Sequence, residues 1–332
     1  MPSRRQTLAS LLALTVLPNN AWSKSPMLLR FGVYSQTIFN LPIWVALEQG
    51  FFADAGVPLE LNPGRSMDDV RQSLLDGSGP LALLGPELAF IDKVGLDRVR
   101  IIAGNANSPP HFLIAQPRFH TIADLRGATF GVISEEEGTT FLVRKVMSAA
   151  GIAPSDYKIA AVGSAPARVK LLDDGVIDAA LQPFPLSYEA EAKGFTNLGW
   201  IGLAEPEWQF TAMLANRKWL DRNLDLSANV LLAMLRGRRF MEDQPEIAVR
   251  IALKHMTTTP SLARRALEDT LRLRIMDRSL RWSDRGLSEI YATLQQAKLL
   301  PSSPRFRVTD FVDARPLDRA LRNARDSGAL PS

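Results

Sequence analysis

Residues 28–61 read LLRFGVYSQTIFNLPIWVALEQGFFADAGVPLEL and contain a strand, a polar loop, a helix and a second strand. Leu28 to Val33 is a short apolar run, which predicts a buried strand. Pro42 stands in the first turn of the predicted helix, where its missing N–H costs nothing, and apolar side chains then recur on one helical face. Gly50 marks the end of that face, and alternating apolar residues over 57–61 predict the next strand. This order is typical of a parallel α/β unit.

The order helix, strand, proline and helix occurs twice in the chain, at 74–95 and at 171–194. Each copy opens on a helix end reading LLDG or LLDDG and continues with a short apolar strand. Each closes on a helix that follows a proline and ends at a glycine. We interpret the two copies as one βαβ device used twice, because a solenoid repeat would recur more often and with a fixed period.

Two short apolar segments, His111 to Gln116 and Phe210 to Asn216, bracket a self-contained α/β stretch. A second lobe inserted into the first would be joined by such a pair of strands, so we expect an α/β protein of two lobes. Beyond residue 217 amphipathic spacing predicts helices almost throughout, and we expect this helical tail to pack on the first lobe. The expected boundaries are 24–113 with 212–332 for the first lobe and 114–211 for the second.

The N-terminus has the features of an export signal. Arg4 and Arg5 form a basic region, Leu8 to Leu17 an apolar run, and Ala21-Trp22-Ser23 a small-x-small cleavage site. The apolar run is about half as long as a bilayer-spanning helix, so we expect cleavage of residues 1–23 and a periplasmic mature chain. A buried N-terminal helix is the alternative. The arginine pair also resembles a twin-arginine signal, which leaves Sec and twin-arginine export both open.

The composition excludes several classes of protein. The chain has 332 residues, of which 46% are hydrophobic and 22% charged, enough for two folded lobes. It has no cysteine, which removes disulfides, thiolate metal sites and cysteine nucleophiles. The formal net charge is +4 without a Lys/Arg stripe, so we expect no nucleic-acid partner. The nucleophile-elbow, zinc-helix and phosphate-loop motifs are missing too, and we expect no catalytic residue, metal or cofactor.

Four stretches carry a family resemblance over residues 28–220. They are LPIWVALEQGFF at 41–52 with Gly56 after it, TIADLRG at 121–127, GTT at 138–140 and DDGVIDAA at 173–180. In order and spacing they resemble the nitrate/sulfonate/taurine-type substrate-binding proteins of ABC transporters. This group is similar to the substrate-binding proteins of the thiamine-pyrimidine-precursor type.

The resemblance implies a type II periplasmic-binding-protein fold, in which ligand is held between two lobes and closure is read by a membrane permease. We further expect a monomer that delivers a small organic solute to an ABC permease of the inner membrane and its ATPase. The same superfamily includes the yeast-type synthase of the thiamine pyrimidine, an enzyme whose chemistry relies on a histidine and a cysteine-rich motif. A ligand-sensing domain of the same fold is a further alternative.

In the first lobe, candidate ligand contacts lie where loops follow strands, because ligands collect at the carboxyl ends of strands in open α/β sheets. Tyr34, Thr37 and Phe39 follow the first strand and combine aromatic rings with a hydroxyl. Ser66 precedes a helix whose first N–H groups could meet a ligand, although capping alone explains a serine there. Pro86 and Glu87 open another helix. Glu87 could pair with a cationic nitrogen or simply favour the helix dipole.

In the second lobe, Gly138, Thr139 and Thr140 open a helix and could hold polar ligand groups, and Phe184 could close over an apolar ligand or belong to the core. Glu135-Glu136-Glu137 immediately precedes them and departs from the family pattern. If these carboxylates face the cleft they oppose a strongly anionic ligand, and if they face solvent they complement the helix dipole. We therefore expect a neutral or nitrogen-containing solute in preference to a small oxyanion.

Overall fold

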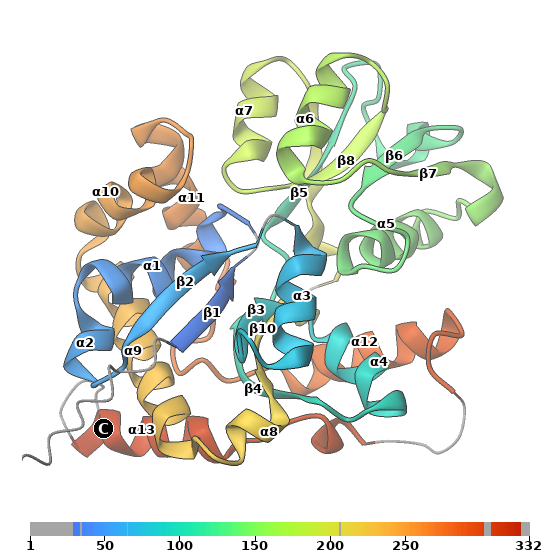
Figure 1. Cartoon of the computed structure of the whole chain (residues 1–332). Helices are drawn as coiled ribbons and strands as arrows, with labels where there is room; N and C mark the ends of the chain where they lie inside the picture. The colour runs from blue at the N-terminus through green and yellow to red at the C-terminus, as the bar shows by residue number, and fades with distance from the viewer. Residues whose placement is uncertain (1–28, 34, 65, 206, 302–306, 327–332) are drawn as a thin grey trace, which may run out of the picture.

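The computed structural model describes residues 29–33, 35–64, 66–205, 207–301 and 307–326. The expected export signal and Tyr34 lie outside these residues. The described chain forms two five-stranded sheets, each flanked by helices, with one sheet above the other in Figure 1. This confirms the two-lobed α/β fold.

The first sheet has the strand order β2-β1-β3-β10-β4. β1 runs parallel to β2 and β3, whereas β10 runs antiparallel to β3 and β4. Its strands are β1 (Leu29–Val33), β2 (Leu59–Pro63), β3 (Leu81–Leu84), β4 (Val99–Ala106) and β10 (Thr211–Asn216).

The second sheet repeats this arrangement with the order β7-β6-β8-β5-β9. β6 runs parallel to β7 and β8, and β5 runs antiparallel to β8 and β9. The repeat at 74–95 and 171–194 therefore supplies the central strand of each sheet, β3 and β8. The strands of the second sheet are β5 (His111–Ala115), β6 (Thr129–Val132), β7 (Lys158–Ala161), β8 (Ala179–Pro183) and β9 (Thr196–Trp200).

The two antiparallel strands are the ones that follow the crossings between the sheets. The chain leaves β4, crosses over 107–110 and enters the second sheet as β5, and after β9 it re-enters the first sheet as β10. Both strands therefore begin slightly before the lobe boundaries expected at 114 and 212. Two short connections of this kind are what a hinge between lobes requires.

Helices cover both faces of each sheet. The glycine expected to end the first helix does so: Gly50 has φ 74° and separates α1 from α2. In the first part of the chain the helices are α1 (Leu41–Glu48), α2 (Phe51–Asp54), α3 (Met67–Asp76) and α4 (Glu87–Gly95), and in the second lobe they are α5 (Gly138–Ala149), α6 (Ala165–Asp173) and α7 (Leu186–Ala192).

The helical tail packs on the first lobe, as expected. α9 approaches α1 so closely that a side-chain carbon added at Gly237 would lie 2.2 Å from the carbonyl oxygen of Pro42. None of the helices over the described residues is long and apolar enough to cross a membrane. The tail comprises α8 (Arg217–Leu220), α9 (Leu224–Asp243), α10 (Pro245–His255), α11 (Pro260–Arg272), α12 (Asp284–Gln296) and α13 (Arg315–Asp326).

Two tail helices also reach the second lobe, which the sequence did not suggest. The hydroxyl of Tyr188 in α7 donates to the carboxylate of Asp269 in α11 at 2.6 Å. Lys145 in α5 pairs with Glu289 in α12 at 2.5 Å and with Glu205 at 3.1 Å. The second lobe is thus tied to the first by side chains on two sides, in addition to the two crossings.

Candidate functional site

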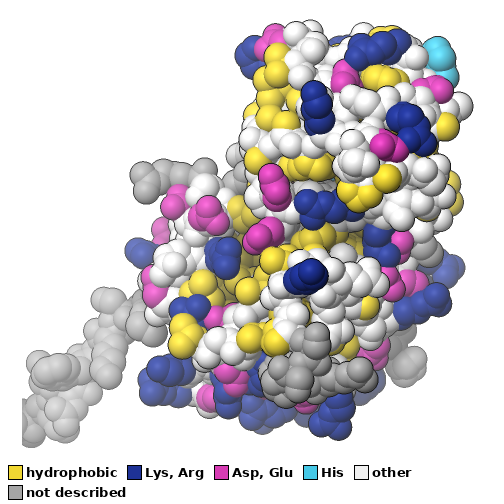
Figure 2. Space-filling view, turned by 90° about the vertical axis from the view of Figure 1, so that its right-hand side faces the viewer, with side chains coloured by type: hydrophobic (Ala, Val, Ile, Leu, Met, Phe, Trp, Pro, Cys, Tyr) yellow, Lys and Arg dark blue, Asp and Glu magenta, His cyan; other side chains and the backbone are white. Residues whose placement is uncertain are grey.

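A cavity of about 1360 Å³ lies between the two lobes and is lined by residues of both. Figure 2 shows the narrower upper part standing on the broader lower part, with hydrophobic side chains visible where the two meet. Val33 and Leu84 bring the ends of β1 and β3 to the cavity, and Ile133 and Pro183 bring the ends of β6 and β8. Carboxyl ends of strands from both sheets therefore converge on one space, which is where α/β sheets bind ligands.

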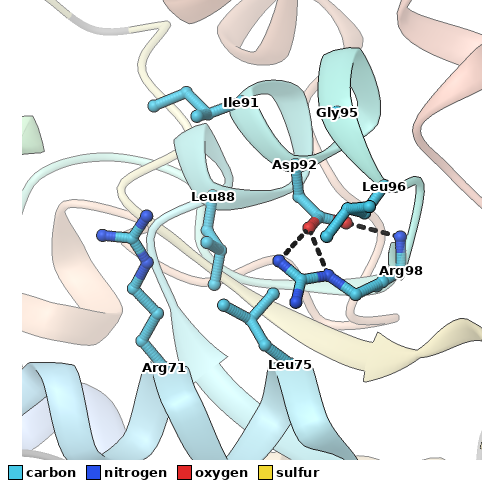
Figure 3. Close-up of a pocket in the computed structure, with 8 residues that line it drawn as sticks. All are labelled: Arg71, Leu75, Leu88, Ile91, Asp92, Gly95, Leu96 and Arg98. Carbon is cyan, nitrogen blue, oxygen red and sulfur yellow. Dashed lines mark hydrogen bonds and ion pairs between the residues drawn. The ribbon is translucent and has the colours of Figure 1, made fainter.

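A second hollow, of about 180 Å³, lies between α3 and α4 on the first lobe (Figure 3). Its buried carboxylate, Asp92, accepts a hydrogen bond from Nε of Arg98 at 2.8 Å and pairs with Nη2 at 2.8 Å. Leu75 and Leu88 fill the space beside this pair (Figure 3). The hollow is small and its carboxylate is already paired with Arg98, so we take the cavity between the lobes as the candidate site.

Glu87 forms the deep acidic part of the cavity. Its carboxylate folds back over Gly85, where an added side-chain carbon would lie 2.1 Å from Oε1, so the glycine makes room for it. The backbone N–H of Gly138, from the other lobe, lies near this carboxylate and favours its ionised form. Burial raises the pKa of the Glu87 carboxyl to about 7, and the nearby charge of Glu137 acts in the same direction. The side chain still opens onto the cavity, so a ligand can reach it.

Glu137 faces Glu87 from the start of α5. Its carboxylate caps the helix by accepting from the backbone N–H groups of Thr139 at 2.9 Å and Thr140 at 3.1 Å, and the Thr139 hydroxyl donates to it as well. Glu135 and Glu136 are exposed, whereas Glu137 is buried and lines the cavity. One of the three consecutive glutamates therefore faces the cleft.

Aromatic rings form an adjoining wall. Phe39 meets Phe210 edge-on at 5.7 Å between ring centroids, and Phe210 meets His111 at 4.6 Å. His111 is 3% exposed and lines the cavity, and its Nδ1 has no hydrogen-bond partner among the described residues. Burial, together with the charge of Arg168, lowers the pKa of His111 well below its usual value, so the imidazole is neutral.

The structure brings five of the expected site residues together around the cavity. These are Thr37, Phe39, Glu87, Gly138 and Thr139.

Four other expected residues do not line the cavity. Ser66 caps α3 by accepting from the N–H of Asp69 at 3.1 Å. Pro86 is buried at the start of α4. The hydroxyl of Thr140 turns away and donates to the carbonyl of Ser134 at 2.6 Å. Phe184 is fully buried and packs on Tyr188 at 5.5 Å in the core.

Several cavity residues were not among those the sequence indicated. Arg168 lines the cavity from α6 and donates to the carbonyl of Gly163 at 3.0 Å. Phe210 and Thr211 line it where the chain returns to the first sheet. The sequence did contain an indication of Arg168. Gly163-Ser164 forms the loop between β7 and α6, and loops that follow strands are where the other candidate residues lie.

Metal binding finds no support in the described residues, in which no group of three or more His, Asp or Glu side chains could hold a metal ion. The candidate site is instead a large, mainly apolar cavity with a few polar groups, of the kind that binds organic molecules.

Comparison with known families supports this description. A family model described as NMT1/THI5 like matches residues 39–248, more than half of the chain. The chain belongs to this family. The resemblance found in the sequence is thereby confirmed.

Individual relatives are more distant. A putative binding protein of Brucella abortus is 25% identical over 258 residues, which cover 76% of this chain and 79% of the relative. The nitrate-binding protein NrtA of Synechocystis superposes with a TM-score of 0.74 at 14% identity, covering 92% of this chain and 91% of NrtA. The aliphatic sulphonate-binding protein SsuA of Escherichia coli gives 0.68 at 16% identity, covering 87% and 92%. At these identities the two structures show a shared fold.

The same fold also occurs in an enzyme. The desulfurization enzyme DSZB superposes with a TM-score of 0.65 at 14% identity, covering 89% of this chain and 99% of DSZB. Fold alone therefore does not separate a binding protein from an enzyme, and the site has to carry that distinction.

Proposed function

We propose that this chain is the solute-binding component of an ABC importer. It captures a small organic molecule in the cavity between its lobes and delivers it to a permease of the inner membrane, which works with an ATPase. The observation that carries the proposal is the convergence of strand ends from both sheets on one cavity. A ligand that contacts both lobes stabilises the closed state by its differential affinity, and closure is a signal a permease can read.

The relatives support this function. The NrtA and SsuA structures are of periplasmic binding proteins, and the Brucella relative carries the description of a putative binding protein. We propose that the chain is exported by a cleaved signal over residues 1–23 and works as a monomer. Its lobes would be 24–113 with 212–332 and 114–211, moving about the two connections between the sheets, from β4 to β5 and from β9 to β10.

An enzyme of the thiamine-pyrimidine synthase type is the alternative. The chain has no cysteine to supply a thiol nucleophile. The Nδ1 of His111 contacts no hydroxyl among the described residues, so this atom holds no nucleophile as a base would. The cavity therefore supports binding over catalysis. A sensing domain would use the same cavity, and an interaction with the permease separates delivery from sensing.

Closure can be measured directly because the chain has no cysteine of its own. Asp68→Cys at the start of α3 and Glu136→Cys before α5 place two exposed labels on opposite lobes, next to the cavity mouth. The mature protein is screened by thermal shift against sulfonates, pyrimidines, amines and aromatic acids. The spin-label distance between the two sites is then measured with each stabilising compound.

We expect a stabilising ligand to shorten this distance. A screen in which nothing stabilises the protein, or in which saturating ligand leaves the distance unchanged, would overturn the proposal. Conversion of a tested compound into a product would favour the enzyme.

A further inference from the structure

The chain's own carboxylates lie at the starts of α4 and α5, two of the helices that face the cavity. The first N–H groups of a helix ordinarily form an anion site. Here the N–H groups of Thr139 and Thr140 donate to Glu137, and the N–H of Gly138 lies beside the carboxylate of Glu87. An oxyanion arriving at this place would find its donors used and two carboxylates beside it.

We propose that the solute carries a protonated nitrogen, an amine or an amidine, which binds between the carboxylates of Glu87 and Glu137. The inference rests on the proposed function, because it names the class of molecule that the cavity captures. The nitrogen belongs to an apolar body that lies against the aromatic wall of Phe39 and Phe210.

The geometry of the two lobes supports a cation at this position. A side-chain carbon added at Gly138 would lie 4.0 Å from Oε1 of Glu87, so the two helix starts come within reach of one small group. The carboxylates of Glu87 and Glu137 repel each other when both are ionised. A positive nitrogen between them removes that repulsion and forms charge-assisted hydrogen bonds to both lobes, which favours closure.

His111 is an independent indication that a polar ligand belongs here. It is more than nine-tenths buried, it lines the same cavity, and its Nδ1 has no hydrogen-bond partner in the described part of the chain. A buried polar atom without a partner carries a free-energy penalty, which a ligand hydrogen bond relieves. The neutral imidazole can accept from a ligand N–H or O–H group or donate to a carbonyl.

An apolar part of the lining fits the body of such a molecule. Leu61, Leu83 and Met67 border the cavity from the first lobe, beside the rings of Phe39 and Phe210. The rings offer faces and edges to an aromatic or alkyl group and attract a nearby cation. The cavity of about 1360 Å³ is far larger than an inorganic ion requires.

The test uses matched trios that differ only in charge. One trio is benzamidine, benzamide and benzenesulfonate, and the other is hexylamine, hexanol and hexanesulfonate. Binding to the mature protein is measured by calorimetry at pH 8. We expect the cation of at least one trio to bind about tenfold or more tightly than its neutral partner, because charge-assisted hydrogen bonds to buried carboxylates are strong. The sulfonates should not bind.

Variants locate the effect. Glu87→Gln removes the charge and should weaken the cation about tenfold or more while leaving the neutral partner unchanged. Gly85→Ala keeps the charge but displaces the carboxylate, since the added carbon would overlap Oε1, and should weaken the cation as well. Glu136→Gln is the control, because this neighbouring glutamate is exposed. Glu137→Gln is compared only if circular dichroism shows that α5, which Glu137 caps, is retained.

The pH dependence of benzamidine binding is a further test, because a purely structural role of Glu87 would not change it. The groups around Glu87 are Glu137 from α5, Arg71 from α3 and the N–H of Gly138. Because the pKa of Glu87 is about 7, benzamidine should bind more tightly at pH 8 than at pH 6, and Glu87→Gln should remove this difference.

The outcomes separate this inference from the proposed function. If a sulfonate or a neutral compound binds and closes the lobes while both cations fail, the inference is wrong and the proposed function stands. The inference is equally wrong if Glu87→Gln leaves cation binding unchanged. If neither these probes nor any screened compound closes the lobes, both are wrong.

Discussion

Glu87 makes the stability of the unliganded protein depend on pH in a direction that can be measured. The pKa of its carboxyl is raised from 4.5 to about 7 in the folded protein. Between these two pH values the folded state holds a proton that the unfolded state has released. The free energy of unfolding therefore falls as pH rises from 4.5 to 7, and is constant with respect to this group above and below that window.

The size of the effect follows from the same shift. A pKa raised from 4.5 to about 7 corresponds to roughly 3 kcal/mol of lost stability once the group is fully ionised. This is an upper value, because the side chain opens onto a water-accessible cavity that screens part of the interaction.

The perturbation is Glu87→Gln, which is uncharged at every pH. Urea unfolding of the wild type and the variant is followed at pH 5.0, 6.5 and 8.0. The amide changes the free energy of unfolding by the same amount at each pH. The pH dependence of the difference in unfolding free energy between variant and wild type therefore reports the ionisation of Glu87 alone. We expect the variant to gain about 1–3 kcal/mol over the wild type between pH 5 and pH 8.

Glu136→Gln, at an exposed site, should show no such trend. If the difference in unfolding free energy between Glu87→Gln and wild type stays constant with pH, the pKa of the Glu87 carboxyl is not raised. That result would refute the burial of this carboxyl at the acidic end of the cavity.

Three further substitutions test the packing around the site. Gly237→Ala should destabilise the protein by about 1–3 kcal/mol, because the new carbon would lie 2.2 Å from the carbonyl oxygen of Pro42. This cost outweighs the higher helix propensity of alanine. A raised melting temperature would contradict the close approach of α1 and α9. Tyr188→Phe removes the 2.6 Å hydrogen bond to Asp269 and should cost about 1–3 kcal/mol in urea unfolding, and a change below about 0.5 kcal/mol would argue against a buried bond. Lys145→Met breaks the ion pairs that Lys145 of α5 makes with Glu289 of α12 and with Glu205. Such partly exposed pairs contribute about 1 kcal/mol or less, so we expect the unliganded lobes to open only slightly, seen as a longer spin-label distance. An unchanged distance would show that these pairs do not hold the lobes together.

Local sequence patterns were sufficient for the elements and their order. The short apolar strand expected within 74–95 is β3, Ser66 caps α3 as expected, and Gly50 ends α1. These features depend on neighbours within a few residues, so periodicity, capping and glycine conformation reveal them without knowledge of the fold. The repeat at 74–95 and 171–194, interpreted as one βαβ device used twice, contains the central strand of each sheet, β3 and β8.

The direction in which individual side chains point was not accessible in this way. Sequence left open whether the glutamates before α5 face solvent or cleft, and the structure exposes Glu135 and Glu136 while turning Glu137 inward. Phe184 could have faced a ligand or the core, and packing on Tyr188 places it in the core. Arg168 became a cavity residue only because α6 presents it at the end of the second sheet.

By itself, the amino-acid sequence determined an α/β protein of two related halves, its family and the loops from which a binding site is built. Only the tertiary structure decided that Glu87 of one lobe meets Gly138 and Glu137 of the other, beside a buried imidazole whose Nδ1 has no partner among the described residues. The physical reason is that strand, helix and cap are set by interactions between near neighbours in the chain. The charge and shape of the cavity arise instead from contacts between segments far apart in the sequence, which form only when the two sheets are folded and brought together.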